Sequence, residues 1–228
     1  MNKTFLDIDE IQCLENSADN LRDRLLIRLH YFVACRVSEV LGLTVSDINF
    51  NQGSITIEHL KTRITLFCPE CNVRLSKSHR FCPGCGVSVE RAVAREKQHR
   101  RMRTLPCDPD TLELLKEYID RGGPVSQNGK RVLFGITRFR VREIVKECAR
   151  KAGLPMLINS ETGKLHHVSP HRLRDAFAVH AVQTDDSGDG LRLLQEHLGH
   201  KSIVTTMRYR KVAGEEQREW FDKLWQRD

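Results

Sequence analysis

The sequence predicts a mainly helical protein with one small antiparallel β-sheet, in the α+β class. Most segments repeat apolar residues at the helical period, whereas a single stretch alternates apolar and polar residues as a strand does. Two Cys-x-x-Cys pairs separated by ten residues follow that stretch and predict an inserted module. The 228 residues are enough for one sizeable core or two small ones.

The first part of the chain is predicted to contain three helices and a β-hairpin. The second helix repeats Leu21, Leu25 and Leu29 at the helical spacing. In the stretch INFNQGSITIE, a turn at Asn51-Gln52-Gly53 precedes isoleucines that alternate with polar residues, which is typical of a hairpin followed by a strand. The predicted ranges are 7–17, 19–34 and 37–42 for the helices and 48–58 for the hairpin.

After the cysteine pairs, a strand is expected to resume at Met102–Leu105. Asp108 then caps a helix that has Pro109 at its first position and stops before Gly122-Gly123-Pro124. The remaining periodic segments predict helices at 137–151, 170–183, 190–198, 202–210 and 215–227.

Composition and charge exclude several classes of protein. No run of about eighteen apolar residues occurs, and the start MNKTFLDIDE has no apolar signal core, so a cytoplasmic protein without membrane contact is expected. The net charge is +7, and residues 61–103 contain eleven basic and three acidic residues. The rest of the chain is nearly neutral, so the positive charge is concentrated in one segment.

The two cysteine pairs, in CPEC and CPGC, have the spacing of a zinc ribbon. Their four thiolates can converge on one tetrahedral zinc ion per chain, and with no ligand position left open that zinc is structural. Two disulfides or a redox dithiol are the alternatives. The predicted ligands are Cys68, Cys71, Cys82 and Cys85. The scattered cysteines, expected to be free thiols, are Cys13, Cys35, Cys107 and Cys148.

Several residues indicate a function only when their order along the chain is considered. Arg36 lies in RVSEVLGL, His171 and Arg174 lie in HRLR, and His200 ends an LGH motif with Tyr209 nine residues later. Taken singly, each has an ordinary explanation: a helix-terminal arginine, a basic helix face, a loop histidine and a core tyrosine.

In this order the motifs resemble those of the catalytic domain of tyrosine recombinases, the phage integrase or Xer-type family. The resemblance covers about residues 5–60 and 100–212, and Lys61 stands about one residue from the family's hairpin lysine. Ala34-Cys35 replaces the usual lead-in to the arginine, Asp175 stands where a second His is common, and the cysteine segment splits the hairpin.

The resemblance implies a tyrosine recombinase catalytic-core fold with a zinc-ribbon insertion. The expected domains are the catalytic domain, at 1–60 and 104–228, and the ribbon, at 61–103, without the N-terminal core-binding domain of the family.

The implied activity is site-specific breakage and rejoining of DNA strands through a 3′-phosphotyrosyl intermediate. Tyr209 would attack the phosphate, while Arg36 and Arg174 would hold its non-bridging oxygens with guanidinium groups that remain charged. His171 and His200 would donate hydrogen bonds or move protons. The covalent intermediate conserves the bond energy, so neither ATP nor a catalytic metal is implied.

Two further residues are expected to assist these catalytic residues. Lys61 would protonate the departing 5′-oxygen, with Lys97 as a competitor. Glu39 would orient Arg36, although a solvated glutamate is an alternative.

The partner implied by the resemblance is double-stranded DNA, next to which the ribbon would contact phosphates. A hairpin extension used for protein contacts is the alternative for the ribbon, and a solvated face is the alternative for the run HRRMR. The predicted DNA-contacting residues are Arg74, Lys77, Arg80, Arg91, Arg95, Arg100, Arg101 and Arg103.

A tetramer on DNA is expected, with the free protein monomeric or weakly associated. The tail 214–228 carries an apolar stripe that would dock on a neighbour or pack on its own domain. A degenerate, non-cutting DNA-binding regulator and a relaxing topoisomerase are the alternative functions.

Overall fold

The computed structural model describes residues 3–76, 78–159 and 162–212. The chain divides into two compact units, one formed by residues 1–57 and 103–228 and the other by residues 58–102. We call them the helical unit and the cysteine unit. No helix in the described ranges is long and apolar enough to cross a membrane.

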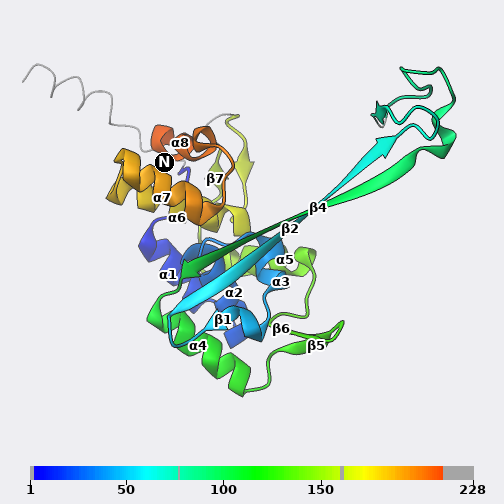
Figure 1. The fold of residues 1–228 in the computed structure, drawn as a ribbon. Coiled ribbons are helices and arrows are strands. Elements are labelled where there is room, and N and C mark those ends of the chain that lie inside the picture. Colours follow the sequence, from blue (N-terminus) through cyan, green and yellow to red (C-terminus); the bar gives the residue numbers. More distant parts are fainter. Residues whose placement is uncertain (1–2, 77, 160–161, 213–228) are drawn as a thin grey trace, which may run out of the picture. The chain divides into compact units, whose positions relative to one another are not determined.

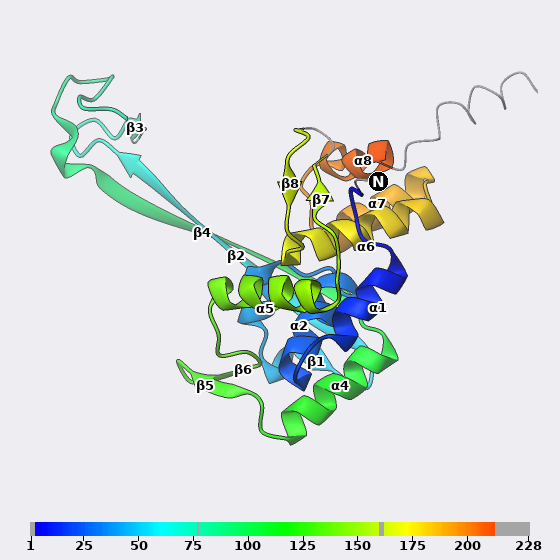
Figure 2. The ribbon, with the colours of Figure 1, turned by 180° about the vertical axis from the view of Figure 1, so that it is seen from behind.

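Eight helices are described, all in the helical unit (Figures 1 and 2). They begin where the sequence offers a cap: Asp7 and Glu10 form a capping box, and Asp108 precedes Pro109. The helices are α1 (Ile8–Asn16), α2 (Leu21–Tyr31), α3 (Val37–Gly42), α4 (Pro109–Asp120), α5 (Arg138–Lys151), α6 (Pro170–Thr184), α7 (Gly188–Leu198) and α8 (Ile203–Val212).

The principal sheet is antiparallel around a long strand. β2 (Ser54–Phe67) pairs with β1 (Ile48–Asn49), β3 (Arg74–Leu75) and β4 (Val93–Pro106). Short 3₁₀ turns lie at Val45–Asp47 and Val89–Arg91. The mainly helical class with a small antiparallel sheet is therefore confirmed, although β2 and β4 are longer than the predicted strands.

Two small hairpins were not predicted. They are β5 (Val125–Gln127) with β6 (Lys130–Val132), and β7 (Leu157–Ile158) with β8 (Leu165–His166). The turn of the first is Asn128-Gly129, with φ of 48° and 74°. An Asn-Gly pair with both φ values positive is the usual two-residue hairpin turn, so the signal was present in the sequence.

The core of the helical unit surrounds α2, on which Leu25, Leu26 and Leu29 are fully buried. Helix α6 packs against α2 on one side and against α7 and α8 on the other (Figures 1 and 2). A second apolar cluster joins Ala34, Ala178 and Leu198, and Tyr209 packs against it. This cluster packs α7 and α8 against α6, whose first turns carry the HRLR motif.

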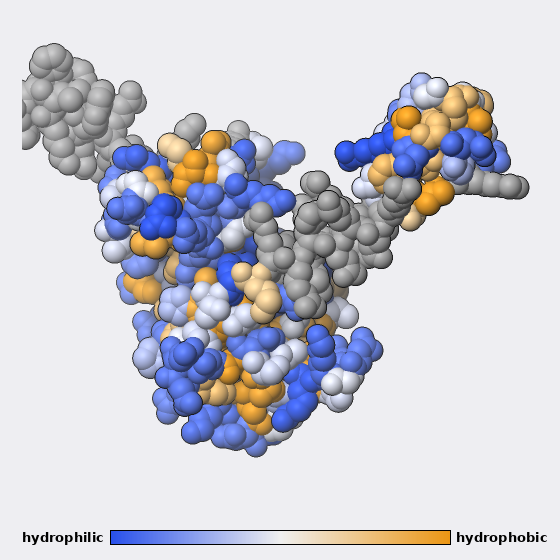
Figure 3. Space-filling view, in the orientation of Figure 1, coloured by the Kyte–Doolittle hydropathy of each residue, from blue (hydrophilic) through white to orange (hydrophobic). Residues whose placement is uncertain are grey.

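The cysteine unit has its own small core of Cys68, Leu75 and Cys82. Its exposed apolar side chains contribute to the apolar surface that Figure 3 shows on this unit. They are Val73, Phe81, Val87, Val93 and Met102. The predicted helix at 215–227 lies outside the described residues.

Candidate functional site

Glu39 is the buried centre of a group of arginines in the helical unit. Its side chain is 1% exposed, and Arg36 donates to it from both the backbone N–H, at 2.8 Å, and Nη1, at 2.9 Å. Arg103 approaches the same carboxylate with two guanidinium nitrogens, at 3.0 and 2.8 Å. Burial alone would raise the pKa of Glu39, but the hydrogen bonds and charge of Arg103, together with Arg36, lower it to about 2.

Arg174 is the second arginine of the site and is almost fully buried. Its guanidinium donates to the backbone carbonyls of Ala34 and Leu198 and lies 3.9 Å from Glu39. Burial and the charge of Arg36 lower the pKa of Arg174 to about 10. Ala34 has φ of 52°, so the chain just before Arg36 turns in a way that presents its carbonyl to Arg174.

The LGH motif ends α7 and positions His200. Gly199 is the left-handed cap of α7, with φ of 62°, and a Cβ added there would lie 3.0 Å from Arg103 Nη1. The His200 backbone N–H donates to the Gln195 carbonyl, and its ring Nδ1 lies 3.0 Å from the hydroxyl of the buried Thr206. Burial, followed by the charge of Arg174, lowers the pKa of His200 to about 4, so the imidazole is neutral at neutral pH.

Tyr209, on α8, points its hydroxyl at the first turns of α6. The hydroxyl donates to Asp175 Oδ1 at 2.9 Å, and the ring stacks on His200 with centroids 6.3 Å apart. Burial and the negative charge of Asp175 raise the pKa of Tyr209, whereas the charges of Arg174 and Arg36 act to lower it. The sequence led us to expect a histidine as the partner of this hydroxyl, and the structure has an aspartate instead.

His171 is the most exposed member of the site, with a side chain 79% exposed. Its Nδ1 lies 2.9 Å from Asp175 Oδ2, and this hydrogen bond raises the pKa of His171. A pocket of about 780 Å³ opens beside these side chains. Its polar lining includes His171, Arg172, Asp175, His200, Arg208 and Tyr209.

The structure therefore brings five of the six predicted catalytic residues into the helical unit. The sixth, Lys61, lies on β2 in the cysteine unit, and its side chain is outside the described residues. The side chains of four predicted DNA-contacting arginines also lie outside the described residues, and so does the whole of Lys77. Those four are Arg91, Arg95, Arg100 and Arg101. Arg74 and Arg80 are described, and both are exposed.

Arg103 does not have the environment expected of a DNA-contacting side chain. Its guanidinium is 16% exposed, holds Glu39 with two nitrogens and donates from Nε to the His197 carbonyl at 3.0 Å. The phosphate contact of Arg103 stays a prediction, and in this structure its guanidinium is engaged within the helical unit, beneath the LGH motif.

The contacts of Asp175 and Thr206 with site residues were not predicted from the sequence. Asp175 was noted only as a departure from a family pattern, and Thr206 carried no signal. The contact of Asp175 with Tyr209 depends on how α8 packs on α6, which no local pattern encodes. The contact of Thr206 with His200 spans only six positions.

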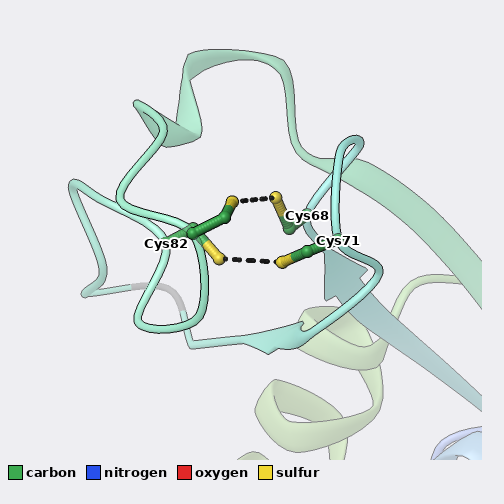
Figure 4. A group of neighbouring side chains, drawn as sticks. Cys68, Cys71 and Cys82 are labelled. Atoms are coloured by element: carbon green, nitrogen blue, oxygen red, sulfur yellow. Dashed lines mark hydrogen bonds between the residues drawn. The ribbon is translucent and has the colours of Figure 1, made fainter.

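The four paired cysteines come together in the cysteine unit (Figure 4), and all four sulfur atoms lie within 4.8 Å of one another. Sγ of Cys68 is 3.5 Å from that of Cys85, and Sγ of Cys71 is 3.4 Å from that of Cys82. These separations exceed the roughly 2.05 Å of a disulfide bond.

The two Cys-x-x-Cys turns have the same backbone pattern. The N–H groups of Cys68 and Cys82 donate to carbonyls five residues later, at 2.9 and 2.8 Å. The residue after each pair has a positive φ, 60° at Asn72 and 73° at Gly86. In the second turn, the Gly84 N–H points at Cys82 Sγ at 3.3 Å.

Comparison with protein families gives one match. The profile of the phage integrase family matches residues 4–69 and 64–216 of this chain.

The chain is also similar to curated proteins. It is 27% identical to the tyrosine recombinase XerA of Pyrococcus horikoshii, over 94% of this chain and 59% of that protein. It is 30% identical to the tyrosine recombinase XerD of Neisseria meningitidis serogroup A, over 85% of this chain and 51% of that protein. The chain thus spans about half to three fifths of the length of these relatives.

Solved structures share the fold. The crystal structure of a XerA recombinase superposes with a TM-score of 0.64 at 18% identity, covering all of this chain and 68% of that one. A XerH site-specific recombinase bound to its palindromic difH substrate gives a TM-score of 0.59 at 24% identity, covering 96% of this chain and 53% of that one.

Proposed function

Because the chain belongs to the phage integrase family, we propose that it is the catalytic part of a site-specific DNA recombinase. It breaks and rejoins DNA strands through a 3′-phosphotyrosyl intermediate on Tyr209. One observation carries the proposal: Tyr209 packs against the apolar cluster that includes Ala34 and Leu198. The carbonyls of those two residues hold Arg174, and Arg174 and Arg36 form one network with Glu39.

The roles of the arginines follow from this network. A phosphate undergoing attack gathers negative charge on its equatorial oxygens, and guanidinium groups match that charge with paired N–H donors. Glu39 offsets part of the repulsion between Arg36, Arg103 and Arg174, which allows three cations to share a small volume. Arg36 is the more accessible of the two phosphate-binding arginines, with a side chain 33% exposed.

The histidines have different environments, so they are suited to different tasks. His200 is neutral at neutral pH, and Thr206 fixes its Nδ1, leaving Nε2 to face a substrate. His171 keeps its proton to higher pH because Asp175 accepts a hydrogen bond from it, so it serves as a donor to a phosphate oxygen. Lys61 is proposed to protonate the departing 5′-oxygen.

A covalent trapping assay tests this function. Randomised DNA duplexes that carry a nick are incubated with the protein in EDTA, and DNA attached to protein is recovered after denaturation and sequenced. We expect an adduct with selected sequences, none with Tyr209→Phe, and a loss of at least about a hundredfold with Arg36→Ala or Arg174→Ala. Arg192→Ala, on the exposed face of α7, is the matched arginine control.

An adduct that persists in Tyr209→Phe would place the nucleophile elsewhere and contradict the proposal. Selective DNA binding without any adduct would favour the non-cutting regulator instead.

The cysteine cluster is proposed to hold one structural zinc ion. Four thiolates around zinc at about 2.3 Å place neighbouring sulfurs about 3.8 Å apart. Two of the observed contacts, 3.4 and 3.5 Å, are a little shorter, and all four sulfurs lie within 4.8 Å of one another. The ligands would be Cys68, Cys71, Cys82 and Cys85. Zinc would supply folding energy to the cysteine unit and take no part in strand cleavage.

DNA is the proposed partner of both units. The exposed Arg74 and Arg80 of the cysteine unit are available to contact phosphates. Assembly into a tetramer on DNA, with the tail 214–228 docking on a neighbour, stays a prediction because that tail lies outside the described residues.

A further inference from the structure

Asp175 is placed to do more than link two helices. Its Oδ1 accepts the Tyr209 hydroxyl at 2.9 Å, while Oδ2 contacts His171 Nδ1 at 2.9 Å and Arg172 Nη1 at 3.2 Å. An ionised carboxylate is only an acceptor, so the tyrosine hydroxyl is the donor in this pair. The proton that Tyr209 must lose to become a nucleophile therefore already points at Asp175.

The two histidines are less well placed for that proton. His200 uses Nδ1 with Thr206, and its ring lies nearly parallel to the Tyr209 ring, at an interplanar angle of 16°. In the described residues, the Tyr209 hydroxyl donates to Asp175 and not to a nitrogen of His200. His171 is hydrogen-bonded to the other oxygen of Asp175.

We propose that Asp175 accepts the proton of Tyr209 in the strand-cleavage step. This inference rests on the function proposed above. As Tyr209 Oη forms its bond to the scissile phosphorus, its proton moves to Asp175 Oδ1. The bond from phosphorus to the 5′-oxygen breaks, and that oxygen takes a proton from Lys61. In rejoining, the 5′-hydroxyl attacks the phosphorus and gives its proton back to Lys61. The bond from phosphorus to Tyr209 Oη breaks, and Asp175 returns the proton to Tyr209.

The surroundings of the carboxylate suit this step. His171 and Arg172 occupy Oδ2 and hold the carboxylate in one orientation, with Oδ1 toward Tyr209. The side chain of Asp175 is 14% exposed, so little water competes for Oδ1. The other charged or titratable groups around the pair are Arg36 before α3, Arg174 on α6 and His200 after α7.

Asp175→Asn is the first test because the amide keeps the size of the side chain and cannot take the proton. We expect adduct formation on the nicked duplex to slow by about a hundredfold or more. Asp186→Asn is the matched control: Asp186 also ties α8 to the rest of the unit, through Arg210 at 3.2 Å, and does not contact Tyr209. An equal loss in both variants would mean that Asp175 only docks α8.

The second test replaces Tyr209 with 3,5-difluorotyrosine, a more acidic phenol that needs less help from a base. If Asp175 takes the proton, 3,5-difluorotyrosine should raise the rate of adduct formation by Asp175→Asn at least about tenfold. It should give no comparable increase in the parent protein. The absence of any such selective rescue would overturn the proposal.

A fluorine NMR titration of the same residue reports the contact without DNA. The phenol should titrate at lower pH in Asp175→Asn than in the parent protein, and an unchanged titration would contradict the contact.

A parent protein that forms no adduct, or an adduct that survives Tyr209→Phe, overturns the proposed function. A normal adduct that is insensitive to Asp175→Asn overturns this inference alone.

Discussion

Arg103 and Glu39 form a two-point ion pair, with Nη1 3.0 Å from Oε1 and Nη2 2.8 Å from Oε2. The same guanidinium lies against Gly199, the residue before His200. One side chain thus connects the carboxylate that holds Arg36 to the loop that carries His200. The arrangement of the site should therefore depend on Arg103.

Replacing Gly199 with Ala tests this dependence, and Gly153→Ala is a matched control. Both glycines have left-handed φ values, 62° and 67°, but only at Gly199 would the new Cβ meet Arg103. Each substitution should lower the free energy of unfolding by about 1–2 kcal/mol, as measured in urea. Only Gly199→Ala should also slow adduct formation, by about tenfold or more, because it displaces Arg103. Equal adduct rates in the two variants would contradict this.

The pKa of Glu39 makes a prediction about stability in acid. Its pKa falls from the ordinary 4.5 to about 2 in the folded protein, so its stabilisation is complete above pH 4.5 and is lost as the pH falls toward 2. The loss should be about 3 kcal/mol, measured as unfolding free energy in urea across that range. Glu39→Gln should lack this part of the pH dependence, and parallel curves for the two proteins would contradict the assignment.

Thr206 should control the orientation of His200. Thr206→Val keeps the shape of the buried side chain but removes the hydroxyl 3.0 Å from Nδ1. We expect adduct formation to slow by about fivefold to tenfold, the effect of one hydrogen bond. Thr206→Ser restores the hydroxyl and should recover most of the rate, whereas equal rates in Val and Ser variants would show that the contact is unimportant.

Metal removal should affect the cysteine unit selectively. Elemental analysis of the purified protein is expected to give one zinc per chain, and chelation should increase hydrogen exchange in residues 58–102 while α2 stays protected. Cys71→Ser should lower the zinc content, and Cys13→Ser, an exposed cysteine outside the cluster, should not. A folded cysteine unit without metal would contradict the proposed zinc.

The sequence predicted the helices well because their ends carry local signals. Asp108 with Pro109 marks the start of α4, and the structure begins the helix at that point. The strands were predicted less well. β2 continues to Phe67 because it pairs with β4, and the pairing of two distant segments gives no strong local pattern in either sequence. The hairpin at Asn128-Gly129 had a local signal and was overlooked.

For the site, motifs in order predicted which arginines, histidines and tyrosine take part. The partners of those residues could not be read in the same way. Asp175 meets Tyr209 across 34 positions of sequence, and Arg103 meets Glu39 across 64. Both contacts come from tertiary packing, so only the three-dimensional structure assigns them.

The two strands that enter the cysteine unit have consequences for protein engineering. Thr56 on β2 and Thr104 on β4 both belong to the helical unit, and their hydroxyls lie 3.3 Å apart. Because paired antiparallel strands can be joined by a two-residue turn, we expect that residues 58–102 can be replaced by such a turn. A chain closed by Asn-Gly at this point would keep Arg36, Arg174 and Tyr209 and would lack Lys61. Such a minimal protein would separate the attack on phosphorus from the protonation of the leaving group.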